Sequence, residues 1–545
     1  LAGTHCLVRS EHYQAVAPSR RVRLVFDCRT RFMKRRADLD GDEGGRYKIQ
    51  ADPSPATEGG DGMIRGRGRR HAAYLRKVRQ LNSQFTAWVK TRVAPGLPPL
   101  PLSSAVTDYI KYANDLKNEY ADALQEDTSG SLLVWGTGDM GQLGLGEDVS
   151  EKSRPFPLSL GQLPVMTIAC GGMHSLAVTQ DGKVWSWGVN DEGALGRQVT
   201  SSNTHLSGQA AAPSGGLPDN EPGPVTEGLP AMDPVVAVSA GDSHSVALTK
   251  GGDVYAWGTF RDASGLWKFD PSTKICSKPA LVLRKSAAGS AVVQISSGAD
   301  HVLARTSAGQ VFSWGCGERG RLGRLAEDQC DGRKNAGSEC PKLLTPAPIT
   351  DGLKGASIVS VGCCAFSSFA IAKDGKVYGW GMNNYGQLGW EVPTEKGRAG
   401  DGFYAPREIT SLSHKGVACI KGGEHHAIAL TSSGEVLSFG RPTYGRLGRS
   451  DVDTNSDEPY HEPRPVLGME GKAVGVAAGV SISAAVTEKG SVYVWGYGDT
   501  CQLGKGKDEE DELLPVLMKS NKFFSGNTVT EIAFGGQHAA MIAKE

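Results

Sequence analysis

A short segment that opens with Trp-Gly (Phe-Gly in one copy) and closes with Leu-Gly recurs through the chain after residue 130. Its first copy, Val134–Gly144, reads Val-Trp-Gly-Thr-Gly-Asp-Met-Gly-Gln-Leu-Gly, and the copy from Trp257 has lost its ending. The opening glycines lie 52 to 70 residues apart, at positions 136, 188, 258, 315, 381, 440 and 496. A period of roughly 50 residues with several short strands and glycine-rich turns is typical of a β-propeller. The seven copies therefore predict an all-β fold, a seven-bladed β-propeller over residues 131–545.

The two ends of this region are expected to pair with each other. The repeat region begins with a strand at Leu132–Trp135 and finishes with strands at Ile532–Phe534 and Ala539–Ile542. If these strands share one blade, the ring closes without an exposed sheet edge.

The composition of the whole chain narrows its class. Its net charge is zero and 39% of its residues are hydrophobic, so we expect an ordinary soluble globular protein. It contains no run of 18 apolar residues, and we expect no membrane-spanning segment. Eleven cysteines without a CxxC pair favour a reducing compartment.

Two motifs that suggest catalysis or nucleotide binding are explained by the repeat. The glycines 136, 138 and 141 match the dinucleotide fingerprint, but that motif needs a helix next, and here another strand follows. The sequence Asp242-Ser243-His244 has the groups of a catalytic triad at consecutive positions, which point to opposite faces of a strand. No spacing typical of metal ligands occurs.

Histidines recur at one position of the repeat, at 174, 244, 301, 426 and 538. Recurrence indicates a structural role, a buried side chain that hydrogen-bonds between blades. The position just before each histidine varies instead, and only Asp300 and His425 are ionisable there. Asp242 and Glu424 stand close by in the sequence. The turns after Trp-Gly add further polar residues: Asp139, Asp191, Glu318, Asn384 and Asp499. Together they predict an acidic, hydrogen-bonding rim on one face, suited to a basic partner surface.

The degenerate third copy is the clearest departure from the repeat. After Trp257-Gly258 it continues Thr-Phe-Arg-Asp-Ala-Ser-Gly-Leu-Trp-Lys. Drift of one loop would explain this change, and so would a protruding hairpin presented by a rigid scaffold. The segment comprises Phe260, Arg261, Asp262, Ala263, Ser264, Gly265, Leu266 and Trp267.

With these motifs, residues 131–545 resemble the family of the regulators of chromosome condensation, which are chromatin-bound nucleotide exchange factors for the GTPase Ran. The strings that carry the resemblance are residues 138–144, 190–197, 240–244, 260–262 and 423–426. The resemblance implies exchange activity, a nuclear location on chromatin, and no cofactor or metal, because exchange breaks no covalent bond. It also implies that the Phe-Arg-Asp hairpin is a wedge pushed against Ran beside its phosphate loop.

The same resemblance assigns roles residue by residue. Asp300 and His425 become the key exchange residues. The Ran contacts that it implies are Asp139, Asp191, Asp242, Arg261, Asp262, Arg324, Asn384, Glu424 and His538. This chain departs from the family pattern at Ala299 and at Ala263-Ser264. Three basic residues in the insertion at 325–346, Arg333, Lys334 and Lys342, become candidates for the acidic histone surface.

The region before the propeller divides into three parts. Residues 1–70 form a basic arm, predicted to be mostly disordered, in which Arg65, Arg67, Arg69 and Arg70 suit nuclear import or contact with DNA phosphates. A solvated tail without either role is equally compatible. Residues 71–125 show helical spacing interrupted by prolines and predict a helical hairpin, followed by a polar linker at 126–130. Residues 81–89 and 108–112 resemble the nuclear-basket nucleoporin segment that binds importin α and Ran, which implies importin α as a partner.

Three other functions compete with nucleotide exchange. A binding-only propeller would use the same repeats, but it does not explain the divergent third turn or Asp300. A light-sensing propeller needs tryptophans clustered on one face, whereas six of the ten here occupy the Trp-Gly position, where blade packing explains them. A ubiquitin-ligase component would need a ligase domain, and none follows the repeats in this sequence.

Overall fold

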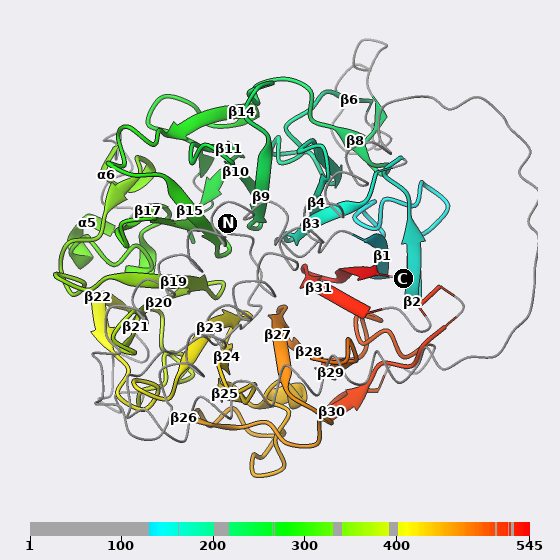
Figure 1. Ribbon diagram of the computed structural model, residues 1–545, viewed down its shortest axis with the longest axis vertical. Helices are drawn as coiled ribbons and strands as arrows, with labels where there is room; N and C mark the ends of the chain where they lie inside the picture. The colour runs from blue at the N-terminus through cyan, green and yellow to red at the C-terminus, as the bar shows by residue number, and fades with distance from the viewer. Residues whose placement is uncertain are drawn as a thin grey trace, which may run out of the picture. The chain divides into compact units, whose positions relative to one another are not determined.

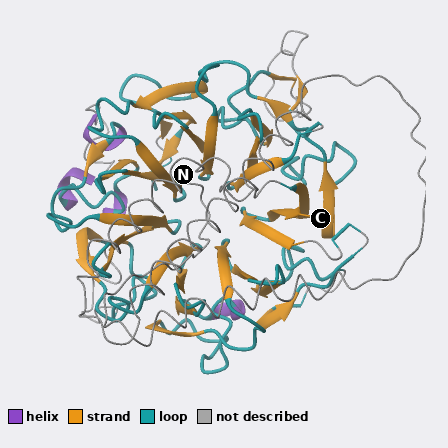
Figure 2. Cartoon of the chain, in the orientation of Figure 1, coloured by secondary structure: helices purple, strands orange, loops and turns teal. Residues whose placement is uncertain are grey.

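The computed structural model describes residues 130–161, 163–200, 217–263, 265, 267–330, 341–391, 402–506, 510–521, 523–524 and 528–544. These residues form seven four-stranded antiparallel sheets placed around a centre, as predicted (Figure 1). Strands and loops dominate, and helices are few and short (Figure 2). The basic arm, the helical hairpin and most of the linker lie outside the described residues.

Each blade places its first strand nearest the centre (Figure 1). Six blades are continuous in sequence. The first two contain β3 (Val165–Cys170), β4 (His174–Thr179), β5 (Val184–Gly188) and β8 (Gly223–Pro224), and then β9 (Val235–Ala240), β10 (His244–Thr249), β11 (Val254–Gly258) and β14 (Cys276–Leu283). The next two contain β15 (Val292–Ser297), β16 (His301–Thr306), β17 (Val311–Gly315) and β18 (Ala347–Pro348), and then β19 (Ile358–Cys363), β20 (Ser367–Ala372), β21 (Val377–Gly381) and β22 (Phe403–Glu408). The last two contain β23 (Val417–Gly422), β24 (His426–Thr431), β25 (Val436–Gly440) and β26 (Tyr460–Pro465), and then β27 (Ala473–Ala478), β28 (Ile482–Thr487), β29 (Val492–Gly496) and β30 (Glu512–Leu517).

The small elements lie in the connections. They are β6 (Val199–Thr200), β7 (Leu217–Pro218), β12 (Phe260–Arg261), β13 (Trp267–Lys268), η1 (Glu318–Gly320), α5 (Glu327–Cys330), α6 (Pro341–Leu344) and η2 (Thr443–Gly445). None of the helices in the described ranges is long and apolar enough to span a bilayer.

The seventh blade joins the two ends of the propeller and confirms the predicted closure. Its strand order is β2 (Glu151–Leu158), β1 (Ser131–Thr137), β32 (His538–Lys544) and β31 (Thr528–Phe534). Leu132 pairs with Ile542 in antiparallel register, so the first and last strands of the repeat region are hydrogen-bonded. This pairing covers edges that would otherwise template aggregation.

The repeated tryptophans are buried and tie neighbouring blades together. All six are at most 1% exposed. In five of them the indole N–H donates to a backbone carbonyl in the turn of the preceding blade, as Trp380 does to Arg321 at 3.0 Å. The other pairs are Trp135 to Gln502, Trp187 to Gln142, Trp257 to Ala194 and Trp495 to Arg446. Each of these five tryptophans thus contributes both an apolar contact and one hydrogen bond to the interface between two blades.

We expect the Trp380→Ala variant to lose about 3–5 kcal/mol of stability, because truncating a buried aromatic side chain leaves a cavity. The free energy of unfolding from urea denaturation measures this loss. Trp390→Ala is the matched control, because Trp390 is only partly buried. Equal stability of the Trp380 variant and the wild type would contradict the packing described here.

The recurring histidines form a second link between blades. In four of them Nε2 lies 2.8–2.9 Å from a serine hydroxyl on the second strand of the next blade. The pairs are His174 with Ser245, His301 with Ser368, His426 with Ser483 and His538 with Ser175. Where the histidine is replaced, by Ser367 or Ile482, the next blade carries Ala427 or Ala539 in place of the serine. The expected structural role is therefore present at four of the five histidines, and His244 differs.

Candidate functional site

One end of every blade carries both the variable position and the turn after Trp-Gly. Pairing explains this, because the first residue of the second strand faces the last glycine of the third strand, as His301 faces Gly315 and His426 faces Gly440. The residues just before the second strand and just after the third therefore lie at the same edge. The sequence-predicted rim is built from these two sets of loops.

Asp300 is a buried carboxylate of this rim. It is 9% exposed, and its Oδ1 accepts a hydrogen bond of 2.8 Å from the backbone N–H of Arg261. Burial, and then the charge of Asp242, raise the pKa of Asp300 to about 6, while the charges of Arg261 and Arg321 act in the opposite direction. Asp242 is in contact with solvent, yet partial desolvation raises its pKa too, against the same two arginines. Two carboxylates and two guanidinium groups thus share one part of the rim.

The divergent third turn forms a two-stranded hairpin, β12–β13, beside Asp300. Phe260 is its root and is only 3% exposed, packed against His244 with ring centroids 4.6 Å apart. The Arg261 side chain forms an ion pair with Glu192 of the preceding blade. The backbone N–H of Ala263 donates to Glu318 Oε2 of the following blade at 2.9 Å. The hairpin is therefore fastened on both sides.

Among the residues of the hairpin whose burial the structure describes, those at the tip are the most exposed, and Phe260 is buried. Ala263 and Gly265 are exposed, and Asp262 is half-buried. Ser264 and Leu266 lie outside the described residues. Any surface that this hairpin offers to a partner is consequently centred on residues 262–265.

His425 lies in a stack of rings and guanidinium groups. Its side chain is 14% exposed and packs between Tyr385 and Phe366, with centroid distances of 4.8 and 6.0 Å. Arg441 lies over Tyr385 at 4.7 Å, and Arg321 lies over Phe366 at 5.0 Å. This row of three rings with an arginine at each end crosses the rim from Arg321, whose charge acts on Asp300, past His425 to Arg441.

The imidazole of His425 is neutral at pH 7. Burial, and then the charges of Arg446 and Arg441, lower its pKa to about 4. Glu424 lies 3.6 Å from its Nε2, too far for a hydrogen bond. His425 therefore offers a neutral polar ring to a partner.

The arginines were missed in the sequence. The predicted acidic, hydrogen-bonding rim combined carboxylates with His425 and Asn384 and left out Arg321 and Arg446, which occupy the turn position that carries Gln142 or Gln387 in other blades. That replacement was the available signal. The observed rim contains both carboxylates and guanidinium groups, so its charge is mixed.

The other predicted contacts are dispersed. Asp139 and Asp191 are exposed on the turns of their blades, and Asn384 is half-buried, with Oδ1 accepting from Gln387. His538 is 1% exposed and is bonded to Ser175. The side chain of Lys342 is exposed. The remaining basic candidates, Arg333, Lys334 and the four arginines of the arm, lie outside the described residues.

Arg324 belongs to a structural set instead of the rim. Its guanidinium donates to the Ser313 carbonyl and to carbonyls of the loop that follows. Arg197, at the same repeat position, donates to the Ser186, Leu217 and Pro218 carbonyls. The shared geometry indicates that these arginines brace the outer loop of a blade.

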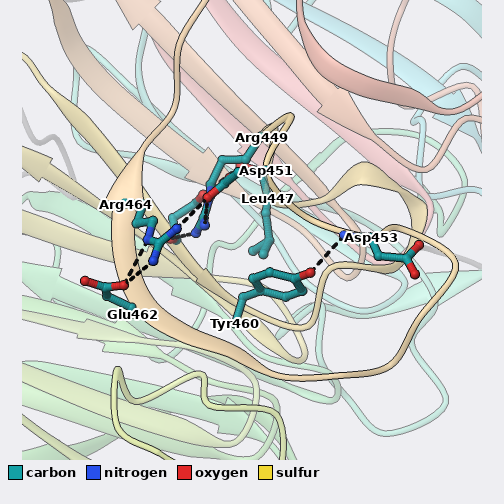
Figure 3. Close-up of polar contacts among 8 residues, drawn as sticks. Leu447, Arg449, Asp451, Asp453, Tyr460, Glu462 and Arg464 are labelled. Atoms are coloured by element: carbon teal, nitrogen blue, oxygen red, sulfur yellow. Dashed lines mark hydrogen bonds and ion pairs between the residues drawn. The ribbon is translucent and has the colours of Figure 1, made fainter.

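Arg449 occupies the same repeat position and donates to the Ser438 carbonyl. It also belongs to an ion-pair network with Asp451, Glu462 and Arg464 (Figure 3). Asp451 accepts from Arg449 and Arg464, and Arg464 also binds Glu462 (Figure 3). The hydrogen bond from Arg449 is the main reason why the pKa of Asp451 falls to about 2. Within the ranges described above, no three His, Cys, Asp or Glu side chains are placed to hold a metal ion.

The fold and the rim together define a repeat propeller that presents one modified turn and a mixed-charge surface at one end. The family model of the RCC1-like domain matches residues 131–541, so the chain belongs to this family.

Curated relatives and a solved structure agree with this membership. The regulator of chromosome condensation of Xenopus laevis is 36% identical over 422 residues, covering 76% of this chain and 90% of the relative. The guanine nucleotide exchange factor SRM1 of Saccharomyces cerevisiae is 32% identical over 435 residues, covering 74% and 86%. The crystal structure of Prp20p from Saccharomyces cerevisiae matches with a TM-score of 0.65 at 30% identity, covering 77% of this chain and 92% of that chain. The resemblance found in the sequence is confirmed.

Proposed function

We propose that this chain is a guanine nucleotide exchange factor for the small GTPase Ran. SRM1 carries the name of a guanine nucleotide exchange factor, and the Prp20p structure was described together with binding to Gsp1p and histones. The observation that carries the proposal is the bond between Asp300 and the backbone of Arg261. It joins the variable position of one blade to the one turn that departs from the repeat.

Exchange requires no bond making by the protein. A factor that binds the nucleotide-free GTPase tightly must weaken nucleotide binding by the same factor, because coupling is reciprocal. The tip of the hairpin displaces groups that hold the phosphates. If release is accelerated by a factor of about 10⁵, the barrier falls by roughly 7 kcal/mol.

The docking surface of the proposal follows the rim. Asp300, Asp242 and Arg321 surround the root of the hairpin, while His425 and Glu424 extend the surface across the stacked rings. Asp139, Asp191 and Asn384 offer weaker, solvent-exposed contacts. We leave Arg324 and His538 out, because their polar atoms bond within the propeller.

Two substitutions test the role of Asp300. Asp300→Ala removes both the charge and the acceptor for the Arg261 N–H, while Asp300→Asn keeps an acceptor and removes the charge. We expect both variants to slow the release of labelled GDP from Ran strongly, with the alanine variant slower, and to leave the melting temperature nearly unchanged. His425→Ala should behave in the same way.

Asp374→Ala serves as the control, since Asp374 lies in an exposed turn at the opposite end of its blade. Loss of activity in parallel with loss of folding would show that Asp300 and His425 are structural instead.

The proposal extends to location and further partners. A family named for chromosome condensation suggests a chromatin-bound nuclear protein, and yeast RCC1 (Prp20) has been crystallised bound to Kap60. We infer that the basic arm contacts DNA, that Arg333, Lys334 and Lys342 contact histones, and that residues 71–125 bind importin α.

Replacing Arg65, Arg67, Arg69 and Arg70 with alanine tests the arm. Four phosphate contacts contribute up to about 3.6 to the slope of log affinity against log salt on duplex DNA. We expect that slope to flatten in a fluorescence titration, with exchange in solution unchanged. An unaltered slope would assign these arginines to import or to a solvated tail.

A further inference from the structure

Five interfaces of the propeller carry the recurring histidine, and one of them lacks the polar links that the other four share. Where the links are complete, a histidine bonds a serine of the next blade, and that serine and a tryptophan both donate to one turn carbonyl. At the interface that follows the hairpin blade, the serine is replaced by Val302, and the turn that would supply the carbonyl is the divergent one. Both ring nitrogens of His244 and the indole nitrogen of Trp314 are buried there without a hydrogen-bond partner.

The root of the hairpin occupies the place of the missing links. Phe260 belongs to the same apolar cluster as Val302 and Trp314 and packs against the ring of His244. It also touches Gly315, where an added Cβ would come within 3.1 Å of its ring. Phe260, Val302 and the two unpaired side chains together form what we call the Phe260 socket.

The socket is lined by apolar side chains, but it also contains the nitrogens of His244 and Trp314, which need hydrogen-bond partners. Buried donors and acceptors without partners are costly, and they regain hydrogen bonds as soon as water reaches them. Burial of the Phe260 ring favours the seated hairpin, and the unpaired nitrogens of His244 and Trp314 oppose it. None of the other interfaces with a histidine combines these opposing terms.

We propose that His244, Val302 and Trp314 are positioning residues for nucleotide exchange. By leaving His244 and Trp314 unpaired under Phe260, they lower the cost of moving the hairpin out of its seat when the GTPase docks. The role of these residues in exchange rests on the proposed function. The movement of the hairpin follows from the contacts within the propeller alone.

Val302→Thr supplies the missing hydroxyl with almost the same side-chain shape. Four interfaces of this chain show that a hydroxyl at this position reaches the histidine at 2.8–2.9 Å. His244→Leu removes the two unpaired nitrogens altogether. We expect either change to stabilise the seated hairpin. Hydrogen–deuterium exchange of the amides of residues 260–263 in the free chain should slow about tenfold, and release of GDP from Ran at saturating chain should slow by a similar factor.

The control variant, Ser175→Val, creates an unpaired histidine, His538, at the interface between the closing blade and the β3–β8 blade, which the hairpin does not touch in the described contacts. It should lower the melting temperature and leave both the amide exchange at 260–263 and nucleotide exchange unchanged. Unaltered amide exchange in Val302→Thr and His244→Leu would overturn the inference whether or not the chain acts on Ran. Slower amide exchange with unaltered GDP release would also overturn it, by making the socket purely structural. Failure of the wild type to release GDP would instead refute the proposed function.

Discussion

Replacing Phe260–Ala263 with Gly-Glu-Arg-Gly, the sequence of residues 317–320, will leave a folded propeller that has lost most of its exchange activity. The sister turn has no bulky side chain to fill the socket that Phe260 occupies. The variant also loses the Arg261–Glu192 ion pair. Because the rest of the rim is intact, charge-steered docking should survive. Release of GDP at saturating chain should fall by up to about 10⁵, a barrier increase of roughly 7 kcal/mol.

Stopped-flow release of labelled GDP measures the effect, and the nucleotide-free complex gives an independent check. Since coupling between partner and nucleotide is reciprocal, excess GTP or GDP should dissociate the variant complex far less effectively than the wild-type complex. As a control for loop replacement, Pro442–Gly445 in another turn is replaced by the same Gly-Glu-Arg-Gly sequence. If the hairpin variant releases GDP at the wild-type rate, the hairpin takes no part in exchange, and the mechanism must depend on the residues of the rim.

The propeller could be predicted from sequence because its information is repeated. Seven copies of one unit reveal the blade count, the strand order and the closure, and each copy supports the others. The structural role of the histidines was accessible for the same reason. Even the pairing of histidine with serine is visible in the sequence, since Ala427 and Ala539 appear where the preceding histidine is absent.

The site was only partly predictable, because its contacts cross between blades. Asp300 and His425 could be singled out as departures from the repeat, and both lie on the expected face. That Phe260 is buried at the root of the hairpin, and that Arg321, Phe366, His425, Tyr385 and Arg441 stack in one row, depends on distances between residues far apart in the chain. A pattern within one blade does not carry those distances, so charge counting gave an acidic rim where the structure has a mixed one.

The buried histidines make the fold sensitive to mild acid. Burial lowers the pKa of His174 to about 4 and of His244 and His538 to about 3, and His301 and His426 shift well below their usual value. Burial and the nearby arginines lower that of His425 to about 4. In the unfolded chain these residues titrate near pH 6.5.

Because the folded pKa values lie below the unfolded value, the stabilisation is complete above pH 6.5 and is lost as the pH falls towards 4. Asp300, Asp242 and Asp511, whose pKa values are raised, act in the opposite direction but are fewer than the histidines. Each histidine contributes about 1.4 kcal/mol per pH unit in this window, so six contribute roughly 8 kcal/mol between pH 7 and pH 5.5. A loss of that size is comparable with the whole stability of a typical domain.

We therefore expect the propeller to unfold cooperatively close to pH 5, with the urea midpoint falling steeply from pH 6.5 downward. His174→Gln is the matched variant, because glutamine retains a hydrogen-bonding group towards Ser245 and does not titrate. Between pH 7 and pH 5.5, the free energy of unfolding of this variant should fall by about one sixth less than that of the wild type, because one of six histidines is missing. Equal urea midpoints at pH 7 and pH 5.5 in the wild type would mean that the histidines take up protons in the folded chain as they do in the unfolded one. In that case the histidine–serine links between blades could not be neutral, buried contacts.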